Sequence, residues 1–283
     1  METARCPPPS PGSELVIRPS RRLRAVNLAE LWQFRGLLLA ITRRDLTLRY
    51  RQTILGVLWV VIQPILAAGI FSVVFGSIGR FSSDGVPYFL FAYSGMLAWN
   101  VFSNTASSVT GCLVGNSALV AKIYFPRLLL PLAQLGTKVL DFLIAWMVFL
   151  ALAPVIGIGL QVRLLAVPLV LCWLLALALG PALVTCALNV SYRDIGYIVT
   201  VLLPLLLYLS PVAYSARSIP HGLRGFYDVN PLVGAIDAAR WCLLGRGALS
   251  AGEIAYSVGL ALTLLVIGTL YFRSRERLFA DVI

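Results

Sequence analysis

The stretch RRDLTLRYRQTILGVLWVVIQPIL, residues 43–66, changes character abruptly at Gly56. Four arginines precede this glycine, at positions 43, 44, 49 and 51, and an apolar segment with one Gln63-Pro64 break follows it. A cationic, amphipathic helix that leads directly into an apolar helix lies on a membrane surface and contacts both lipid head groups and water. The stretch therefore predicts an integral membrane protein in which an interfacial helix precedes the first span.

The composition of the whole chain agrees with a membrane protein of the helical class. Of its 283 residues 59% are hydrophobic and 12% are charged, and the mean hydropathy is +0.87. Soluble domains average about 45–50% apolar and about 25% charged residues. The apolar runs are continuous rather than alternating, which favours an all-α integral membrane fold over a β-barrel. The net charge of +11 suggests nucleic-acid binding as an alternative, but a chain this apolar offers no soluble face for a phosphate footprint, so we expect no nucleic-acid partner.

The N-terminal part is expected to stay outside the bilayer. Residues 1–20 contain five prolines and predict a disordered tail. From Asn27, a suitable N-cap, an amphipathic helix is predicted to reach about Arg51, within an interfacial segment at 21–52. Its apolar run, residues 37–41, is far shorter than the ~20 residues that a span needs. We therefore expect this helix to lie on the membrane.

Six runs are long enough to cross and make up a transmembrane domain at 53–273: roughly 54–78, 87–111, 128–156, 164–190, 196–214 and 252–272. The third contains Lys138 and Asp141, which share one helix face at i,i+3 spacing. A charged pair inside a span normally faces the protein interior. A structural bridge between helices is the favoured interpretation of the pair, and a role in gating or transport is the alternative.

Positive charge sets the expected orientation. Sixteen Lys and Arg residues lie on the side of the two termini and six on the other, so both termini are predicted to be cytoplasmic. The segment at 113–126 is then a short cytoplasmic connection, and residues 274–283 are a cytoplasmic tail. The apolar segment at 217–248 is external. It is predicted to form two short helices, broken at Asn230-Pro231, that dip back toward the bilayer.

The motifs of several enzyme classes are missing from the sequence. There is no G-x-x-x-x-G-K-[ST], so nucleotide binding of the P-loop kind is excluded. There is also no H-E-x-x-H or G-x-S-x-G, and the five cysteines are widely spaced. With a single histidine, a His-based metal site is not expected. Ion-coupled transporters usually carry ionisable groups within spans, and here only the Lys138–Asp141 pair qualifies. A self-powered pump is therefore disfavoured.

Aromatic residues are abundant in and near the predicted spans. They suit interfacial belts and helix packing, but aromatic faces also stack on sugar rings, so some could line a carbohydrate path. Both interpretations stay open at this stage. The candidates for a channel lining are Trp59, Phe71, Phe75, Tyr88, Phe91, Trp99, Phe102, Tyr208 and Tyr214.

Five blocks, taken in order, resemble one family. They are RRDLTLRYRQTILGVLW (43–59), YFLFAYSGMLAWNVF (88–102), LVAKIYFPRLLLPL (119–132), NVSYRDIGYI (189–198) with YLSPVAY (208–214), and NPLVGAIDAAR (230–240). The chain resembles the membrane subunits of ABC-2 type exporters over about residues 27–283. It is most similar to the permeases that export polysaccharides such as O antigen or teichoic acid.

The resemblance implies a homodimer of six-span subunits in a bacterial inner membrane, paired with two copies of a separate ABC ATPase subunit. ATP and Mg²⁺ would then bind to that ATPase, and no cofactor to this chain. The substrate would be a polyprenyl-pyrophosphate-linked polysaccharide, and the segment at 217–248 would gate the external end. Contact with the ATPase is implied for five residues of the cytoplasmic connection: Asn116, Lys122, Tyr124, Phe125 and Arg127.

The arginines of the interfacial helix suit such a substrate. Guanidinium groups bind phosphate in a bidentate manner, so a pyrophosphate head group could meet Arg43, Arg44, Arg49 and Arg51. Equally, these arginines could bind anionic lipid and fix the topology. Three other functions remain as alternatives: an ABC-2 efflux permease for a small hydrophobic compound, an ion-coupled secondary transporter and a membrane-bound glycosyl-lipid transferase.

Overall fold

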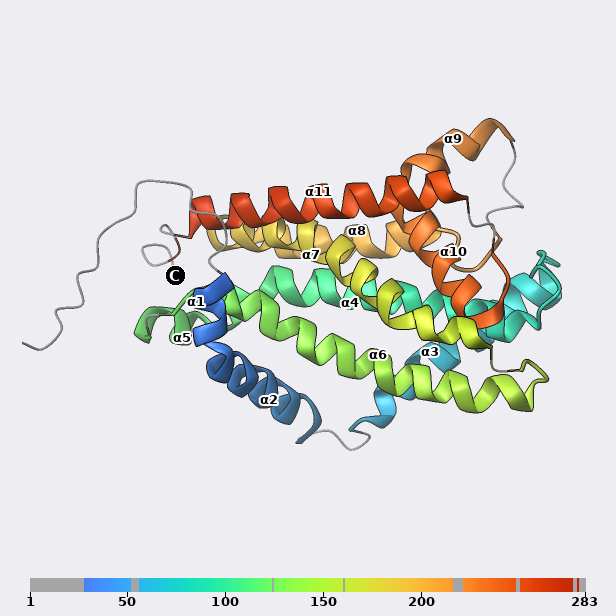
Figure 1. The fold of residues 1–283 in the computed structure, drawn as a ribbon, viewed down its shortest axis with the longest axis horizontal. Coiled ribbons are helices and arrows are strands. Elements are labelled where there is room, and N and C mark those ends of the chain that lie inside the picture. The colour runs from blue at the N-terminus through green and yellow to red at the C-terminus, as the bar shows by residue number, and fades with distance from the viewer. Residues whose placement is uncertain are drawn as a thin grey trace, which may run out of the picture.

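A computed structural model describes residues 28–51, 56–123, 125–159, 161–215, 221–247, 250–276 and 279, and every regular element in them is a helix. The predicted all-helical fold is thereby confirmed. Four long helices form the body of the molecule (Figure 1): α4 (Tyr88–Gly115), α6 (Leu129–Val155), α7 (Val167–Ser191) and α11 (Ala251–Arg275).

Helix α7 lies at the centre of this body and packs most extensively against α11 and α4. The contact between α7 and α11 is so close because glycines face each other across it. A Cβ atom built on Gly180 would lie 2.6 Å from the backbone carbon of Leu264, and one on Gly268 would overlap Gly180 itself. Small residues at helix crossings are typical of membrane bundles, where close backbone approach supplies the packing energy.

Four stretches of the described residues are long and apolar enough to cross a membrane: 58–78, 129–155, 162–191 and 251–275. They correspond to the first, third, fourth and sixth spans expected from the sequence. The second, α4, has 28 residues but carries polar side chains such as Asn100 and Asn104. The fifth, α8 (Asp194–Tyr208), is apolar but only 15 residues long. Length and hydropathy alone therefore support four of the six predicted spans.

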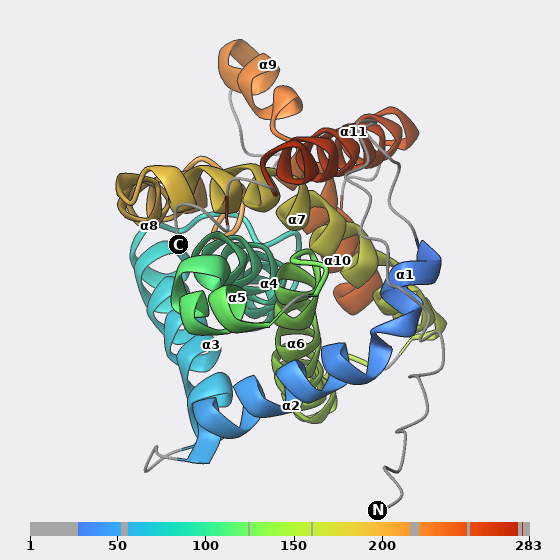
Figure 2. The same ribbon diagram turned by 90° about the vertical axis from the view of Figure 1, so that its left-hand side faces the viewer.

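The shorter helices lie at the two ends of the body (Figure 1). At one end, here called the α2 end, are α1 (Leu28–Gln33), α2 (Arg35–Arg51), α5 (Ser117–Lys122) and the last turns of α11. At the other, the α10 end, are α9 (His221–Val229) and α10 (Pro231–Leu244). Figure 2 shows α2 lengthwise below α6, where α4 and α6 are seen nearly end-on. Helix α2 thus runs across the bundle, as expected of an interfacial helix.

Two details of the first segment differ from the sequence prediction. The interfacial helix is interrupted at Phe34 and so forms α1 and α2 rather than one continuous helix. The first span consists of α3 (Leu58–Phe71) and a π-helical segment, η1 (Ser72–Ile78). Gly56, just before α3, has a φ of +47°, a conformation that glycine adopts at little cost. A glycine at position 56 therefore suits the turn between the cationic helix α2 and the apolar helix α3.

The helix break predicted at Asn230-Pro231 separates α9 from α10. Pro231 occupies the first turn of α10, where its missing N–H costs nothing. The Asn230 side chain caps the helix by accepting a hydrogen bond of 3.0 Å from the Leu232 backbone N–H. The same side chain donates to Ser210 Oγ at 3.1 Å, which ties the start of α10 to the end of α8.

Candidate functional site

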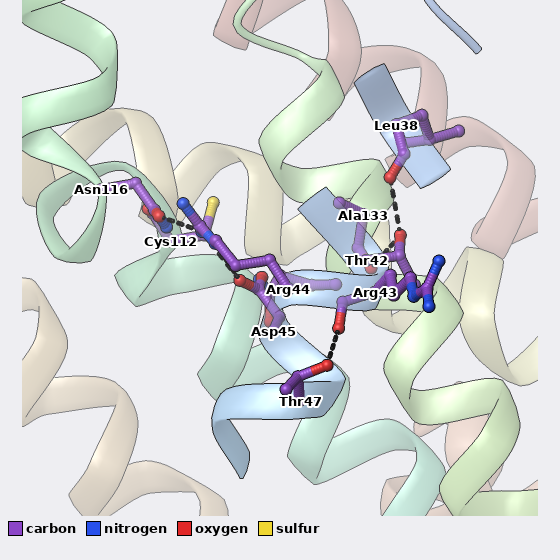
Figure 3. Close-up of polar contacts among 10 residues, drawn as sticks. Leu38, Thr42, Arg43, Arg44, Asp45, Thr47, Cys112, Asn116 and Ala133 are labelled. Atoms are coloured by element: carbon purple, nitrogen blue, oxygen red, sulfur yellow. Dashed lines mark hydrogen bonds and ion pairs between the residues drawn. The ribbon is translucent and has the colours of Figure 1, made fainter. Parts of the chain in front are cut away.

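Helix α2 is fastened to α6 by close contact at its middle. The Thr42 hydroxyl lies 2.9 Å from the Leu38 carbonyl oxygen of its own helix and 3.3 Å from the Ala133 carbonyl oxygen of α6 (Figure 3). A Cβ atom at Gly136 would lie 2.7 Å from Thr42 Cγ2. The glycine therefore lets the interfacial helix rest directly on the backbone of a spanning helix.

A polar network beside this contact joins three elements (Figure 3). Arg44 Nη2 donates to Asp45 Oδ1 at 2.7 Å and to Asn116 Oδ1 at 2.5 Å. Gln134 of α6 donates to the other Asp45 carboxylate oxygen at 2.8 Å. Asn116 stands between α4 and α5 and donates to the Cys112 carbonyl at 2.9 Å. The network therefore connects α2 both to α6 and to the short helix that follows α4.

The C-terminal end of α2 makes a second connection to α6. Arg49 Nη1 lies 2.5 Å from Asp141 Oδ2, and the Tyr50 hydroxyl donates to Asp141 Oδ1 at 2.6 Å. Burial, together with the hydrogen bond to this carboxylate, raises the pKa of Tyr50 to about 12. The phenol therefore keeps its proton at neutral pH and acts as the donor. Both oxygens of Asp141 are thus bonded by α2.

The structure changes the interpretation of the predicted Lys138–Asp141 pair. Both side chains are buried in α6, but the ion-pair partner of Asp141 is Arg49 rather than Lys138. Among the described residues, the Lys138 ammonium forms no ion pair and donates no hydrogen bond. The Arg49–Asp141 contact joins residues 92 positions apart, so no local spacing in the sequence could have indicated it.

Arg49, Lys138 and Asp141 line one pocket between α2, α3, α4 and α6. The pocket is small, with a cavity volume of about 40 Å³, which is room for a few water molecules or one compact anion. Polar groups also come from Gln63 of α3 and Asn100 and Asn104 of α4. Apolar atoms complete the wall, from Val60, Pro64, Leu97, Val101, Phe142 and Ala145.

The four predicted head-group arginines do not form one cluster. The guanidinium groups of Arg44 and Arg49 are engaged within the chain, as described above. Arg43 and Arg51 are exposed, and Figure 3 shows the side chains of Arg43 and Arg44 pointing in opposite directions. The exposed arginines therefore remain available to an external anion.

The predicted ATPase-contact residues also divide into two groups. Phe125 is 5% exposed and packs in the core at the α2 end, and the Arg127 backbone N–H donates to Glu276 Oε1 at 2.9 Å. Lys122 is exposed, and beside it Ile123, absent from the prediction, is 52% exposed. Tyr124 lies outside the described residues. The outward surface here is therefore built by Lys122 and Ile123.

The predicted channel aromatics occupy different environments. Trp99 and Phe102 are buried in the larger of two hydrophobic cores, and Phe91 is buried beneath the guanidinium group of Arg240. Trp59 and Tyr208 are exposed, at 52% and 67%. Of the remaining four, all half-buried, Phe71 and Phe75 stack edge to face at 5.6 Å, Tyr88 lies 5.8 Å from Phe91, and Tyr214 bonds the hydroxyl of Tyr227 at 2.7 Å. These aromatics form packed pairs rather than one continuous row.

The α10 end holds a buried ion pair that the sequence prediction missed. Arg240 is 2% exposed and pairs with Asp237 at 3.4 Å, one helical turn earlier on α10. Its Nη2 also donates to the Val212 carbonyl at 2.6 Å, and its guanidinium lies 3.9 Å from the ring centre of Phe91. A Cβ atom at Gly95 of α4 would lie 2.6 Å from that same carbonyl oxygen. The only signal in the sequence is the i,i+3 spacing within NPLVGAIDAAR.

Known relatives cover almost the whole chain. The chain is 28% identical over 262 residues to the O-antigen export system permease protein RfbA of Myxococcus xanthus, covering 90% of this chain and 98% of the relative. An RfbA of Klebsiella pneumoniae is 27% identical, with 87% and 95% covered. The polysialic acid transport protein KpsM of Escherichia coli is 24% identical, with 84% and 92% covered.

The match to a family model spans most of the fold. Residues 36–244 match the ABC-2 type transporter family, which takes in the helices from α2 to α10 and both polar clusters described above. The geometry fits a membrane subunit of this kind, with an interfacial helix tied to a spanning helix and to a short connecting helix. This chain belongs to the ABC-2 type transporter family.

Proposed function

We propose that this chain is the permease subunit of an ABC exporter that moves a polyprenyl-pyrophosphate-linked polysaccharide, such as O antigen, across the bacterial inner membrane. The observation that carries the proposal is the near full-length similarity to permeases named for O-antigen export. A second group of relatives is named for polysialic acid transport. Both groups are thus named for the transport of a polysaccharide.

In this proposal the energy comes from a partner. The sequence lacks a P-loop, so ATP and Mg²⁺ bind to a separate ATPase subunit. Two copies of that ATPase pair with a homodimer of six-span subunits, both termini of each subunit being cytoplasmic. The exposed Lys122 and Ile123 at the end of α5 supply the contact, and the buried Phe125 supports it from within.

The polar contacts offer a route from the ATPase to the membrane helices. A displacement of α5 acts on Asn116, which bonds Arg44 of α2. Helix α2 in turn holds Asp141 of α6 through Arg49 and Tyr50. A movement that starts at the ATPase surface therefore reaches a spanning helix through two short polar bridges. At the far end, α9 and α10 form the external gate, which the buried Arg240 fastens to the 210–215 turn.

The exposed face of α2 receives the lipid-linked substrate. Arg43 and Arg51 are exposed and form no ion pair within the described residues, and guanidinium groups suit the phosphates of the head group. The same residues would attract ordinary anionic lipid, which would compete with the substrate for this surface.

Deletion of the gene in its own cell tests the proposal. We expect loss of the long surface polysaccharide on gels and immunoblots, accumulation of the lipid-linked polymer inside the cell, and recovery of both when the wild-type chain is supplied. Unchanged surface polysaccharide would contradict the proposal. Unchanged polysaccharide together with new sensitivity to small hydrophobic drugs would instead assign the chain to drug efflux.

A further inference from the structure

The pocket between α2, α3, α4 and α6 has an unusual balance of charge. Two cations, Arg49 and Lys138, line it together with a single carboxylate, Asp141. Arg49 is bound to that carboxylate at 2.5 Å, so the charge of Lys138 is the surplus. At neutral pH the formal charge of the lining is therefore positive.

Lys138 is the unexplained group in this pocket. Its side chain belongs to a spanning helix and is only 7% exposed, yet nothing among the described residues accepts a hydrogen bond from its ammonium group. Burying an ammonium group without a partner costs several kcal/mol, and ionisable residues within spans usually mark a functional site. An anion bound at this position would supply the counter-charge that Lys138 does not find among the described residues.

The remaining polar groups of the lining suit an oxygen-rich anion. The side-chain amides of Gln63, Asn100 and Asn104 can each donate hydrogen bonds. They come from two helices other than α6, with Gln63 on α3 and Asn100 and Asn104 on α4. Together with the ammonium group they provide a cation and several neutral donors, which is the donor set that phosphate oxygens require.

We propose that this pocket binds the phosphate-bearing head of an anionic lipid, with Lys138 as its principal cation. The proposal rests on the proposed function in one respect: the pyrophosphate of the polyprenyl-linked substrate is the expected source of the phosphate. An ordinary anionic phospholipid carries the same chemistry. The lipid tail stays outside the pocket, whose lining includes the partly exposed Arg49.

Occupation of the pocket bears directly on the attachment of α2. An anion bound to Lys138 also faces Arg49 and competes with Asp141 for its guanidinium. Weakening of that ion pair loosens the end of α2 from α6. Binding of the head group would thereby alter the position of α2, which is also bonded to Asn116, next to α5, through Arg44.

The test measures lipid binding to the full chain in nanodiscs of phosphatidylcholine. The probes are a polyprenyl pyrophosphate, the matching uncharged polyprenol and phosphatidylglycerol, each titrated and followed by native mass spectrometry. Lys138→Gln and Lys138→Arg are compared with wild type. Arg193→Gln, which removes an exposed cation at the start of α8, is the matched control.

We expect Lys138→Gln to weaken binding of the pyrophosphate lipid at least about ten-fold, because a charge-assisted hydrogen bond is lost. Lys138→Arg and the control should stay close to wild type, and polyprenol binding should not change. If phosphatidylglycerol loses affinity to the same degree, the pocket is a phosphate site filled by phospholipid. Equal affinities of Lys138→Gln and wild type for both anionic lipids would overturn the proposal. That result would leave the gene-deletion test of the export function unaffected.

Discussion

Asp141 shows how one residue can hold two helices together. Its carboxylate accepts from Arg49 and Tyr50 of α2 while its own backbone belongs to α6. Lys138 lines the same pocket, so Asp141 is the one carboxylate of a lining that holds two cations. The two members of the ion pair are therefore not equivalent. Removal of Asp141 leaves two cations and no carboxylate in the pocket, whereas removal of Arg49 leaves one cation and one carboxylate.

This asymmetry predicts different costs for two neutral substitutions. Asp141→Asn should lower the free energy of unfolding by about 1–3 kcal/mol, because a charged acceptor is lost and both cations are left without a counter-charge. Arg49→Gln should cost about 1 kcal/mol or less, because Asp141 keeps Tyr50 and the pair is partly exposed. Thermal unfolding in detergent, followed by tryptophan fluorescence, measures both. The exposed Asp228→Asn serves as control, and a larger cost for Arg49→Gln would contradict the argument.

Arg240 is the residue on which the α10 end depends. Arg240→Met keeps the volume but leaves Asp237 as an unpaired buried charge and removes the donor to the Val212 carbonyl. We expect a loss of about 3–5 kcal/mol in unfolding free energy, in the range measured for broken buried ion pairs. The exposed Arg246→Met provides the comparison and should stay within about 0.5 kcal/mol of wild type. Equal stability of the two variants would show that Arg240 contributes no such anchor.

At the scale of helices, the crossing of α7 and α11 depends on the absence of side chains. Gly180 meets the backbone of Leu264 at a distance that no Cβ atom tolerates. Gly259, on α11 itself, has open space where a Cβ atom would lie, with no neighbouring atom within 4 Å. Both glycines lie inside long helices, but only Gly180 has backbone atoms where a Cβ atom would lie.

Alanine at the two positions should have effects of opposite sign. Gly180→Ala should destabilise the protein by about 1–3 kcal/mol, because backbone atoms rather than flexible side chains must move. Gly259→Ala should stabilise it by about 0.5–1 kcal/mol, the helix preference of alanine over glycine. Thermal unfolding midpoints of the two purified variants, compared with that of wild type, measure both effects. A neutral Gly180→Ala would mean that the crossing is looser than described.

In the connection around α5, an exposed residue and a buried residue are expected to have different roles. Ile123→Asp should weaken recovery of the partner ATPase in affinity purification and leave the stability of the permease unchanged, since the side chain is 52% exposed. Phe125→Ala should instead lower the stability of the permease by about 3–5 kcal/mol, because a buried aromatic side chain is removed from the core. If Phe125→Ala lost the ATPase while remaining as stable as wild type, the roles assigned here would be reversed.

Periodicity and composition predicted the helical class and the bounds of most helices because each depends on residues close in sequence. The long helices α4, α6, α7 and α11 and the break at Asn230 are examples. The contacts that build the site could not be predicted in this way. Arg44 meets Asn116 across 72 residues, and Arg49 meets Asp141 across 92. Such partners are set by how α2 crosses α6, which no local pattern encodes.

At the scale of the whole molecule, the two ends differ in the helices they carry and in the tasks proposed for them. The α2 end carries α1, α2 and α5, and the α10 end carries α9 and α10, the helices proposed as the external gate (Figures 1 and 2). Helices α4, α6, α7 and α11 connect the two ends. This arrangement suits a subunit that receives both its substrate and its driving force at one end.

The central claim is that this subunit is driven by a separate ATPase. Affinity purification of the tagged chain from its native membrane in mild detergent, with mass spectrometry of the proteins recovered, tests it most directly. We predict a P-loop ATPase at about equal stoichiometry, since the proposed complex pairs two permease subunits with two ATPase copies. Recovery of the chain without any ATPase, repeated in lipid nanodiscs, would contradict the claim and would point to an ion-coupled transporter.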